Sequence, residues 1–248
     1  TGIQVAWLIK QAHEMGIKVG EFQHGLVSKN YEAYNYGDAL INSEEYKKYT
    51  PDFFLSWGNY WNEQIRIPGK KIVIGNPHFS ESIKKYPNFE GEKDTILVSS
   101  QWTVTMEMVG ISSYLAKEFP NYRIIFKLHP GELKNYYLIK PLEGRGNIVI
   151  IKDGDIYEYI SKAEIIVACY STTVFEAFAM KKRIFILDNQ FSQMNIPEGV
   201  GDRFHTNEEL KRLIIDNKTN LKPNVEYYFN PNWKENYINF IKHEVGIK

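Results

Sequence analysis

The chain has 248 residues, and 30 Lys plus Arg balance 30 Asp plus Glu, so its formal net charge at pH 7 is zero. This length allows one large domain or two small ones with a substantial hydrophobic core. A nucleic-acid-binding protein normally carries a basic excess, so the charge balance argues against a nucleic-acid partner. The single cysteine, Cys169, excludes a disulfide framework and favours a reducing compartment.

The sequence shows no segment that predicts membrane insertion or secretion. No apolar run approaches the roughly 20 residues that a transmembrane helix needs. The first residues, TGIQVAWLIKQAHEMG, have neither the basic flank nor the small-residue cleavage site of a signal peptide. We therefore expect a soluble, cytoplasmic protein. No basic amphipathic helix stands out, so peripheral contact with the inner face of the plasma membrane is left open.

The first part of the chain alternates helices with strands. In chain order, we expect a helix at 4–16, a strand at 17–23, a helix at 42–49, a strand at 52–57, a helix at 59–65 and a strand at 70–75. Because a helix comes first, with no strand before it, this part resembles the later half of a Rossmann-like domain. Such a domain is either unusually small or incomplete.

The second part of the chain shows the same alternation more strongly. Strands are predicted at 94–100, 122–128, 147–153, 164–170 and 183–188, and helices at 104–119, 132–142, 155–163, 173–181 and 207–216. The pattern is typical of a parallel sheet flanked by helices. A polar segment with Pro and Gly, YPNFEGEK at 86–93, predicts the domain boundary. We therefore expect an α/β protein with two Rossmann-like domains that face a cleft, at 1–88 and 89–248.

One candidate site lies where the apolar run RIIFKL ends at Lys127, His129 and Pro130. Pro130 cannot donate a ladder hydrogen bond, so it places His129 near the carboxyl end of the strand, where ligands bind in open α/β sheets. An imidazole there can donate a hydrogen bond to an anion or transfer a proton. The alternative is a histidine that merely bonds to a nearby carbonyl group.

A second candidate is CYSTTVFEAF, where a strand ends and Ser171, Thr172 and Thr173 begin a helix. Free backbone N–H groups and the helix dipole make such a helix start attractive to phosphate. However, Thr173 and Glu176 also have the spacing of a capping box, in which both side chains only satisfy the helix end. Both interpretations can hold together, with Ser171 and Thr172 facing the ligand.

Two further loops carry polar side chains after strands. In EFQHGL, Glu21 and His24 are candidate proton acceptors. In VSSQWT, Ser99, Ser100 and Gln101 can donate to a phosphate or a sugar. A purely structural role is the alternative at each of these loops.

The sequence also argues against several kinds of site. Asp153 and Asp155 in KDGDIYEYI have a spacing that can hold a divalent cation, but Asp155 with Glu158 also forms an acidic helix cap, which we favour. The histidines show no zinc spacing. The absence of GxxxxGK[ST], GxGxxG and GxSxG argues against a P-loop ATPase, a dinucleotide oxidoreductase and an α/β-hydrolase.

Four short motifs in chain order resemble one group of enzymes. They are HG at 24–25, IVIGNPHF at 72–79, FKLHPGE at 126–132 and ACYSTTVFEAFAMKKRIFIL at 168–187. Together they resemble GT-B enzymes of bacterial surface-polymer synthesis that use cytidine-activated donors, namely the CDP-glycerol glycerophosphotransferases of teichoic acid assembly and the sialyl- and Kdo-transferases of capsules. Two departures are His78, where the teichoic acid enzymes have Arg, and Leu26, where they have Thr.

The resemblance implies a role for each matching residue. His129 with Pro130 and Ser171 with Thr172 would hold the nucleotide phosphate, and Glu176 would reach the ribose. His24 would act as the base, with Glu21 as the less favoured choice. The complete predicted donor site consists of Ser99, Ser100, Gln101, Lys127, His129, Pro130, Ser171, Thr172, Thr173 and Glu176.

The expected activity is therefore transfer of a glycosyl or glycerophosphoryl group from a CMP- or CDP-linked donor to a glycan or lipid-linked acceptor, in capsule, lipopolysaccharide or teichoic acid synthesis. We expect no metal or other cofactor, because protein donors can neutralise the departing phosphate. One alternative is an enzyme similar to UDP-N-acetylglucosamine 2-epimerase. Another is a non-catalytic module that binds nucleotide sugars.

Overall fold

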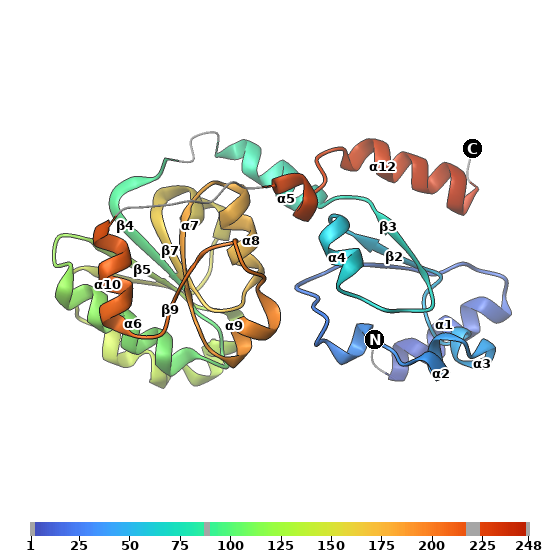
Figure 1. The fold of residues 1–248 in the computed structure, drawn as a ribbon, viewed down its shortest axis with the longest axis horizontal. Coiled ribbons are helices and arrows are strands. Elements are labelled where there is room, and N and C mark those ends of the chain that lie inside the picture. Colours follow the sequence, from blue (N-terminus) through green and yellow to red (C-terminus); the bar gives the residue numbers. More distant parts are fainter. Residues whose placement is uncertain (1–2, 87–89, 217–223, 247–248) are drawn as a thin grey trace. The chain divides into compact units, whose positions relative to one another are not determined.

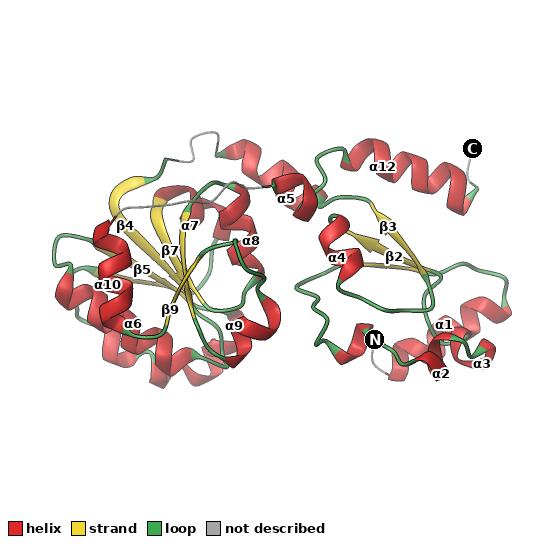
Figure 2. Ribbon diagram, viewed as in Figure 1, coloured by secondary structure: helices red, strands yellow, loops and turns green. Residues whose placement is uncertain are grey.

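The computed structural model describes residues 3–86, 90–216 and 224–246, and the chain divides into two compact units. The first unit comprises Thr1–Ser80 and Asn224–Lys248, and the second comprises Glu81–Pro223. Each unit contains one parallel β-sheet with helices around it (Figure 1 and Figure 2). The predicted α/β class is therefore confirmed.

The sheet of the first unit has three strands. They are parallel and lie in the order β1 (Gly20–Phe22), β2 (Phe53–Ser56) and β3 (Lys70–Val73). All four residues of the central strand β2 are buried, as expected for a strand covered on both faces. The helices before and between these strands, and after β3, are α1 (Ile3–Glu14), α2 (Asp38–Ile41), α3 (Glu44–Lys47), α4 (Asn59–Glu63) and α5 (Pro77–Ser82).

The C-terminal segment belongs to the first unit, whereas the sequence predicted a single domain over 89–248. This segment contains α11 (Val225–Tyr228), α12 (Trp233–Phe240) and a π-helical turn at Ile241–Val245. The Trp61 indole Nε1 donates to the Tyr228 carbonyl oxygen at 2.7 Å, and the rings of Phe53 and Phe240 pack edge to face. Contacts between aromatic residues so distant in sequence leave no local pattern, which is why the boundary differs from the prediction.

The sheet of the second unit has six parallel strands in the order β6-β5-β4-β7-β8-β9. The strands are β4 (Glu92–Ser99), β5 (Arg123–Lys127), β6 (Ile148–Ile151), β7 (Ala163–Ala168), β8 (Arg183–Leu187) and β9 (Asp202–Phe204). The first five match the predicted strands. The short strand β9 was not predicted, because three residues are too few to show a period.

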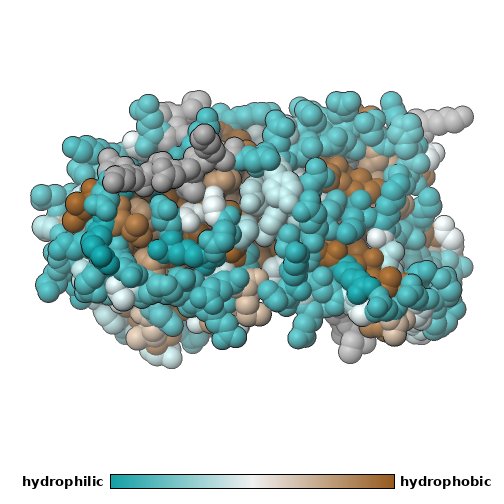
Figure 3. Space-filling model, viewed as in Figure 1, coloured by the Kyte–Doolittle hydropathy of each residue, from teal (hydrophilic) through white to brown (hydrophobic). Residues whose placement is uncertain are grey.

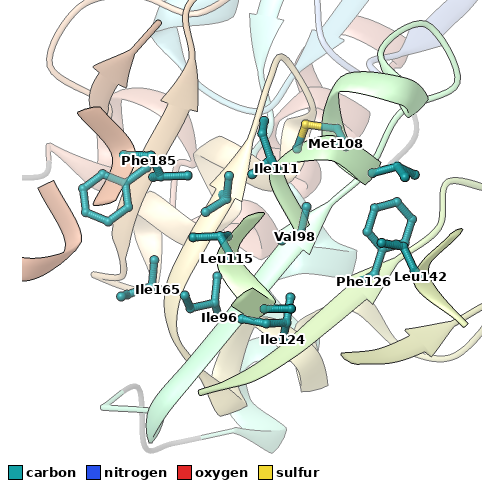
Figure 4. Close-up of a cluster of buried hydrophobic side chains, with 14 of the residues drawn as sticks. Ile96, Val98, Met108, Ile111, Leu115, Ile124, Phe126, Leu142, Ile165 and Phe185 are labelled. Carbon is teal, nitrogen blue, oxygen red and sulfur yellow. The ribbon is translucent and has the colours of Figure 1, made fainter. Parts of the chain in front are cut away.

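Helices of the second unit follow the strands. They are α6 (Thr105–Glu118), α7 (Ile156–Lys162), α8 (Thr172–Ala179), α9 (Gln190–Asn195) and α10 (Asn207–Asp216). In the core, Ile96 and Val98 of β4 pack with Met108 and Leu115 of α6, and all four side chains are fully buried (Figure 4). Burial of each such side chain contributes about 1.5–3 kcal/mol. This core joins the central strand β4 to α6.

One predicted element has a different structure. The α-helix expected at 132–142 is instead a 3₁₀ segment at Pro130–Leu138, interrupted at Asn135, followed by a 3₁₀ turn at Lys140–Leu142. Pro130 starts the segment directly after the strand, and Pro141 cannot donate the backbone hydrogen bond that would continue an α-helix. The apolar spacing in this stretch therefore did not produce an α-helix.

Polar side chains cover most of the face of the molecule seen in Figure 3, with hydrophobic residues between them. Among the described residues, no helix is long and apolar enough to span a membrane. The helix α6, with 14 residues, falls short of the roughly 20 residues required.

The packing of the C-terminal segment on the first unit can be tested at Gly58. A Cβ atom at this position would lie 2.5 Å from the Tyr227 carbonyl oxygen and 2.6 Å from that of Tyr228. We expect Gly58→Ala to lower the free energy of unfolding by about 1–3 kcal/mol, because backbone atoms must move apart. The control is Gly146→Ala, at an exposed loop position where a Cβ meets nothing within 4 Å. Urea unfolding followed by tryptophan fluorescence measures both, and equal midpoints for the two variants would contradict this packing.

Candidate functional site

The strand order of the second unit creates a topological switch point between β4 and β7. From β4 the chain proceeds to β5 and β6 on one side, and then crosses to β7, β8 and β9 on the other side. Connections that leave neighbouring strands in opposite directions open a crevice at their carboxyl ends, where open α/β sheets bind ligands. The register pairs Ser99 with Lys127 and Val98 with Val167, so β4, β5 and β7 end at nearly the same level.

The loops after β4 and β7 are tied together at this switch point. Gln101 Oε1 accepts a hydrogen bond from the Tyr170 backbone N–H at 3.3 Å, and the hydroxyl groups of Thr103 and Tyr170 form a hydrogen bond. The Tyr170 ring stacks on Phe191 of α9, with 5.3 Å between the ring centroids. Gln101 thus positions a loop, which favours the structural role that was its alternative.

His129 lies just beyond the end of β5 and is exposed to solvent. It is the N-cap of the 3₁₀ segment that starts at Pro130, as expected for a proline that ends the ladder. Its Nδ1 accepts a hydrogen bond from the Gly131 backbone N–H at 3.0 Å. In the neutral imidazole the proton is then on Nε2, so this nitrogen can donate. An exposed Nε2–H at this position is what a hydrogen-bond donor to an anion requires, and the role of His129 stays a prediction.

Glu132 was not singled out from the sequence, yet its carboxylate connects three parts of the site. It is 1% exposed, and its Oε2 accepts from the His129 backbone N–H at 2.7 Å. Its Oε1 accepts from the hydroxyl groups of Ser100 and Thr105, each at 2.6 Å. The three-residue spacing of His129 and Glu132 is that of a capping box, a signal obscured because histidine is not a usual N-cap residue.

Three predicted donor-site residues at or directly after the ends of β4 and β5 are buried. Ser99 and Ser100 are 5% and 3% exposed, and Ser100 donates its hydroxyl proton to Glu132. Lys127 is 9% exposed, and its Nζ donates to the Leu128 carbonyl oxygen at 3.2 Å. Burial lowers the pKa of the Lys127 amine. These three side chains are therefore buried and do not face solvent as donors.

The helix α8 starts differently from the predicted capping box. Its N-cap is Ser171, whose Oγ accepts from the Thr173 backbone N–H at 3.2 Å. The capping box considered for Thr173 and Glu176 is wrong, since the N-cap lies two residues earlier, at Ser171, and Thr173 is already within the helix. Ser171 and Thr172 are partly exposed at this helix start, whereas Thr173 is buried. Partly exposed hydroxyl groups at a helix N-terminus suit an anionic ligand.

Glu176 lies one turn further along α8 and is 7% exposed. The Tyr157 hydroxyl donates to its Oε1 at 3.0 Å. Burial raises the pKa of Glu176 to about 7, although the hydrogen bond from Tyr157 opposes that shift. The carboxyl group is thus engaged inside the second unit, a contact that local sequence could not reveal.

Asp155, which the sequence predicted to be a helix cap, caps a helix in the structure. Asp155 is the N-cap of α7, where its Oδ1 accepts from the Tyr157 backbone N–H at 3.0 Å, and its Oδ2 accepts from the Tyr86 hydroxyl. Within the ranges 3–86, 90–216 and 224–246, no group of three or more His, Cys, Asp or Glu side chains could hold a metal ion. Cys169 is buried, and its pKa is raised to about 11 by burial, which makes the thiol unreactive.

The predicted proton acceptors lie in the first unit. His24 is exposed and follows the carboxyl end of β1. The neighbouring Gln23 holds this loop, because its Nε2 donates to the Gly25 carbonyl oxygen and its Oε1 accepts from the Trp57 backbone N–H. Glu21 instead accepts from the Tyr34 hydroxyl at 2.6 Å.

The surroundings of Glu21 argue against a catalytic role. It lines a cavity of about 20 Å³ whose other walls include Pro51 and Gly69, residues that precede β2 and β3. These residues lie at the amino-terminal edge of the sheet, opposite to the edge where His24 follows β1. His24 is therefore the better placed of the two at a ligand-binding edge.

Comparison with known proteins extends this description. No protein-family model matches the chain. An uncharacterized protein of Methanocaldococcus jannaschii is 26% identical over 215 residues, which cover 81% of this chain and 37% of that protein. The chain thus spans little more than a third of the length of this relative.

Solved structures share the fold at low identity. The UDP-GlcNAc 2-epimerase of Neisseria meningitidis bound to UDP-GlcNAc has a TM-score of 0.63 at 17% identity, covering 95% of this chain and 72% of its own. The UDP-GlcNAc 2-epimerase of Methanocaldococcus jannaschii has a TM-score of 0.63 at 18% identity, covering 96% and 73%. A variant of the wall teichoic acid polymerase TagF has a TM-score of 0.56 at 14% identity, covering 93% and 69%. The chain has a GT-B-like fold.

This result confirms the predicted GT-B-like fold with Rossmann-like units. The similar structures belong both to the predicted transferase class and to the epimerase alternative, so they do not choose between the two. At these identities, likeness of fold does not carry over an activity.

The buried carboxyl group of Glu176 predicts a pH dependence of stability. Its pKa is raised in the folded state, so its favourable contribution is complete below the ordinary pKa of 4.5 and is lost as pH rises through about 7. Since one pKa unit corresponds to about 1.4 kcal/mol, the loss is on the order of 3 kcal/mol. We expect Glu176→Gln to melt at a higher temperature than the wild type at pH 8, with the difference shrinking at pH 5. If the difference in melting temperature between Glu176→Gln and the wild type is the same at pH 5 and pH 8, a buried Glu176 that titrates in this range is contradicted.

Proposed function

We propose that the protein is a GT-B-type transferase that takes a cytidine-activated donor and binds the phosphate of the departing CMP or CDP in its second unit. His129 donates from Nε2, and the Thr172 hydroxyl and the N-terminus of α8 provide the remaining donors. Ser171 holds the helix start, since its Oγ donates to Thr173 Oγ1 at 3.0 Å and accepts from the Thr173 backbone N–H. The observation that carries the proposal is the placement of exposed His129 and the partly exposed start of α8 at the ends of β5 and β7, on either side of the switch point.

Local charges favour α8 over α6 as the phosphate-binding helix. The carboxylate of Glu132 accepts a hydrogen bond from the hydroxyl of Thr105, the first residue of α6. A negatively charged group therefore already lies at the start of α6. The start of α8 is instead capped by the neutral hydroxyl of Ser171. Since a helix N-terminus attracts anions and a carboxylate repels them, a phosphate is more stable at α8.

Transfer also requires that the acceptor hydroxyl lose its proton. We assign this step to His24, which is exposed at the carboxyl edge of the sheet in the first unit. The reaction forms a bond from the acceptor oxygen to the transferred group and breaks the bond to the nucleotide phosphate, which leaves with its negative charge. Donors from the protein stabilise that charge, so the proposed reaction needs no metal. The acceptor is a glycan or a lipid-linked glycan of a bacterial surface polymer.

The second candidate is an epimerase-like activity on UDP-GlcNAc, favoured by the two UDP-GlcNAc 2-epimerases that share the fold at a TM-score of 0.63. This activity needs no acceptor. If it is present, proton NMR of UDP-GlcNAc with the protein alone will reveal a second N-acetylhexosamine. For a cytidine-specific transferase, we expect the UDP-GlcNAc spectrum to stay unchanged. We expect a CMP-linked donor to release CMP, and a CDP-linked donor to release CDP on glycosyl transfer or CMP on glycerophosphoryl transfer, in each case only when an acceptor is present.

Nucleotide binding provides the direct test of the donor site. We expect CMP or CDP to raise the melting temperature of the wild type more than UDP or GDP does, since a ligand that binds only the folded state stabilises it. His129→Ala removes a hydrogen bond to a charged group, worth about 1.5–3 kcal/mol, so affinity should fall about 10- to 100-fold. His243→Ala, at an exposed histidine of the first unit, is the matched control. The donor-site assignment fails if His129→Ala responds to cytidine nucleotides as the control does.

A further inference from the structure

We infer that Glu132 is a positioning residue that holds the His129 imidazole in one tautomer, with Nε2–H available to an anion. The inference rests on the proposed function, because it explains how one donor of the proposed phosphate site is set in place. The ligand-free protein already holds His129 in this tautomer, so the tautomer can be measured separately from binding.

The tautomer follows from the contacts of the imidazole ring. Gly131 donates its backbone N–H to His129 Nδ1 at 3.0 Å, so Nδ1 must be unprotonated for this hydrogen bond to exist. The neutral ring then carries its proton on Nε2. An exposed histidine free of this bond would exchange between two tautomers, and only one of them presents a donor at Nε2. The Gly131 N–H therefore keeps the ring in the form that donates to an anion.

Glu132 fixes the turn that aims this N–H group. Its Oε2 accepts from the His129 backbone N–H at 2.7 Å, and its own backbone N–H donates to the His129 carbonyl at 2.9 Å. These two bonds close the turn of residues 129–132 on both sides, so the Gly131 N–H points at the ring. The turn is further anchored because Glu132 Oε1 accepts from Ser100, after β4, and Thr105, in α6.

The chemistry of the contacts matches an ionised carboxylate. All three groups around the side chain of Glu132 are donors, and a carboxylate is the only side chain that offers acceptors alone. An amide at this position would turn one N–H group toward donors on one side. Glu132→Gln thus preserves size while it breaks the pattern of acceptance, which makes it the most informative substitution.

The first experiment observes the His129 ring nitrogens by ¹⁵N NMR of the ligand-free protein at pH 8. We expect the wild type to show protonated Nε2 and unprotonated Nδ1. We expect Glu132→Gln to show averaging of the two tautomers, because the turn no longer holds Gly131. The control is Glu143→Gln, at an exposed carboxylate that accepts from Tyr136, and it should keep the wild-type pattern. Protonated Nδ1 in the wild type, or an unchanged pattern in Glu132→Gln, overturns the inference.

A second variant perturbs the ring without removing the carboxylate. A Cβ atom at Gly131 would lie 3.2 Å from His129 Nδ1, so the ring must shift by a few tenths of an ångström away from the Gly131 N–H. We expect Gly131→Ala to give the averaged tautomer pattern while its melting temperature stays close to that of the wild type. An unchanged ring pattern in this folded variant would also overturn the inference.

Titration with CMP then connects the tautomer to binding. We expect Glu132→Gln and Gly131→Ala to bind CMP about 10-fold more weakly than the wild type, and Glu143→Gln to bind as the wild type does. If the wild type shows the expected tautomer but binds no cytidine nucleotide, the proposed function fails and the positioning role of Glu132 stands. If CMP binds equally well to all variants despite the tautomer change, the link to phosphate binding is overturned.

Discussion

Burial of the central strands of the second unit on both faces determines where its chemistry can occur. The inner residues of β4, β5 and β7 are almost all apolar, and their backbone groups pair within the sheet. A polar side chain in the middle of such a strand would lose its hydration without a partner. Charged and hydroxyl groups therefore collect where the strands end, and parallel alignment brings those ends to one edge.

At that edge, the buried carboxylate of Glu132 limits where a second anion, such as a phosphate, can bind. The Glu132 carboxylate accepts hydrogen bonds from Ser100, Thr105 and the His129 backbone N–H. Since Thr105 is the first residue of α6, the carboxylate lies at the start of that helix. In the proposed function, the phosphate therefore finds its donors at His129 and at the start of α8. The protein has zero formal net charge, so attraction of an anion depends on such local groups and not on a general positive field.

The fold itself is compatible with more than one reaction. Structures of the same GT-B-like fold include epimerases bound to UDP-GlcNAc and a teichoic acid polymerase. Both kinds of reaction act on a substrate that contains a nucleotide phosphate, so a phosphate-binding edge in the second unit is compatible with either. The difference must come from the groups that face the transferred sugar or the acceptor, and in this chain His24 of the first unit is the residue that we assign to that task.

The sequence by itself determined most of the elements and the ends of the longer strands. Apolar runs predicted five of the six strands in the second unit, and Pro130 placed His129 beyond β5, because hydrophobic period and proline geometry act within a few residues. Only the tertiary structure decided that β4 lies beside β7, that Glu132 meets Ser100 and Thr105, and that the C-terminal segment joins the first unit. These contacts join residues far apart in the chain, and they form because strands pair and buried groups find partners in space, which no local pattern records.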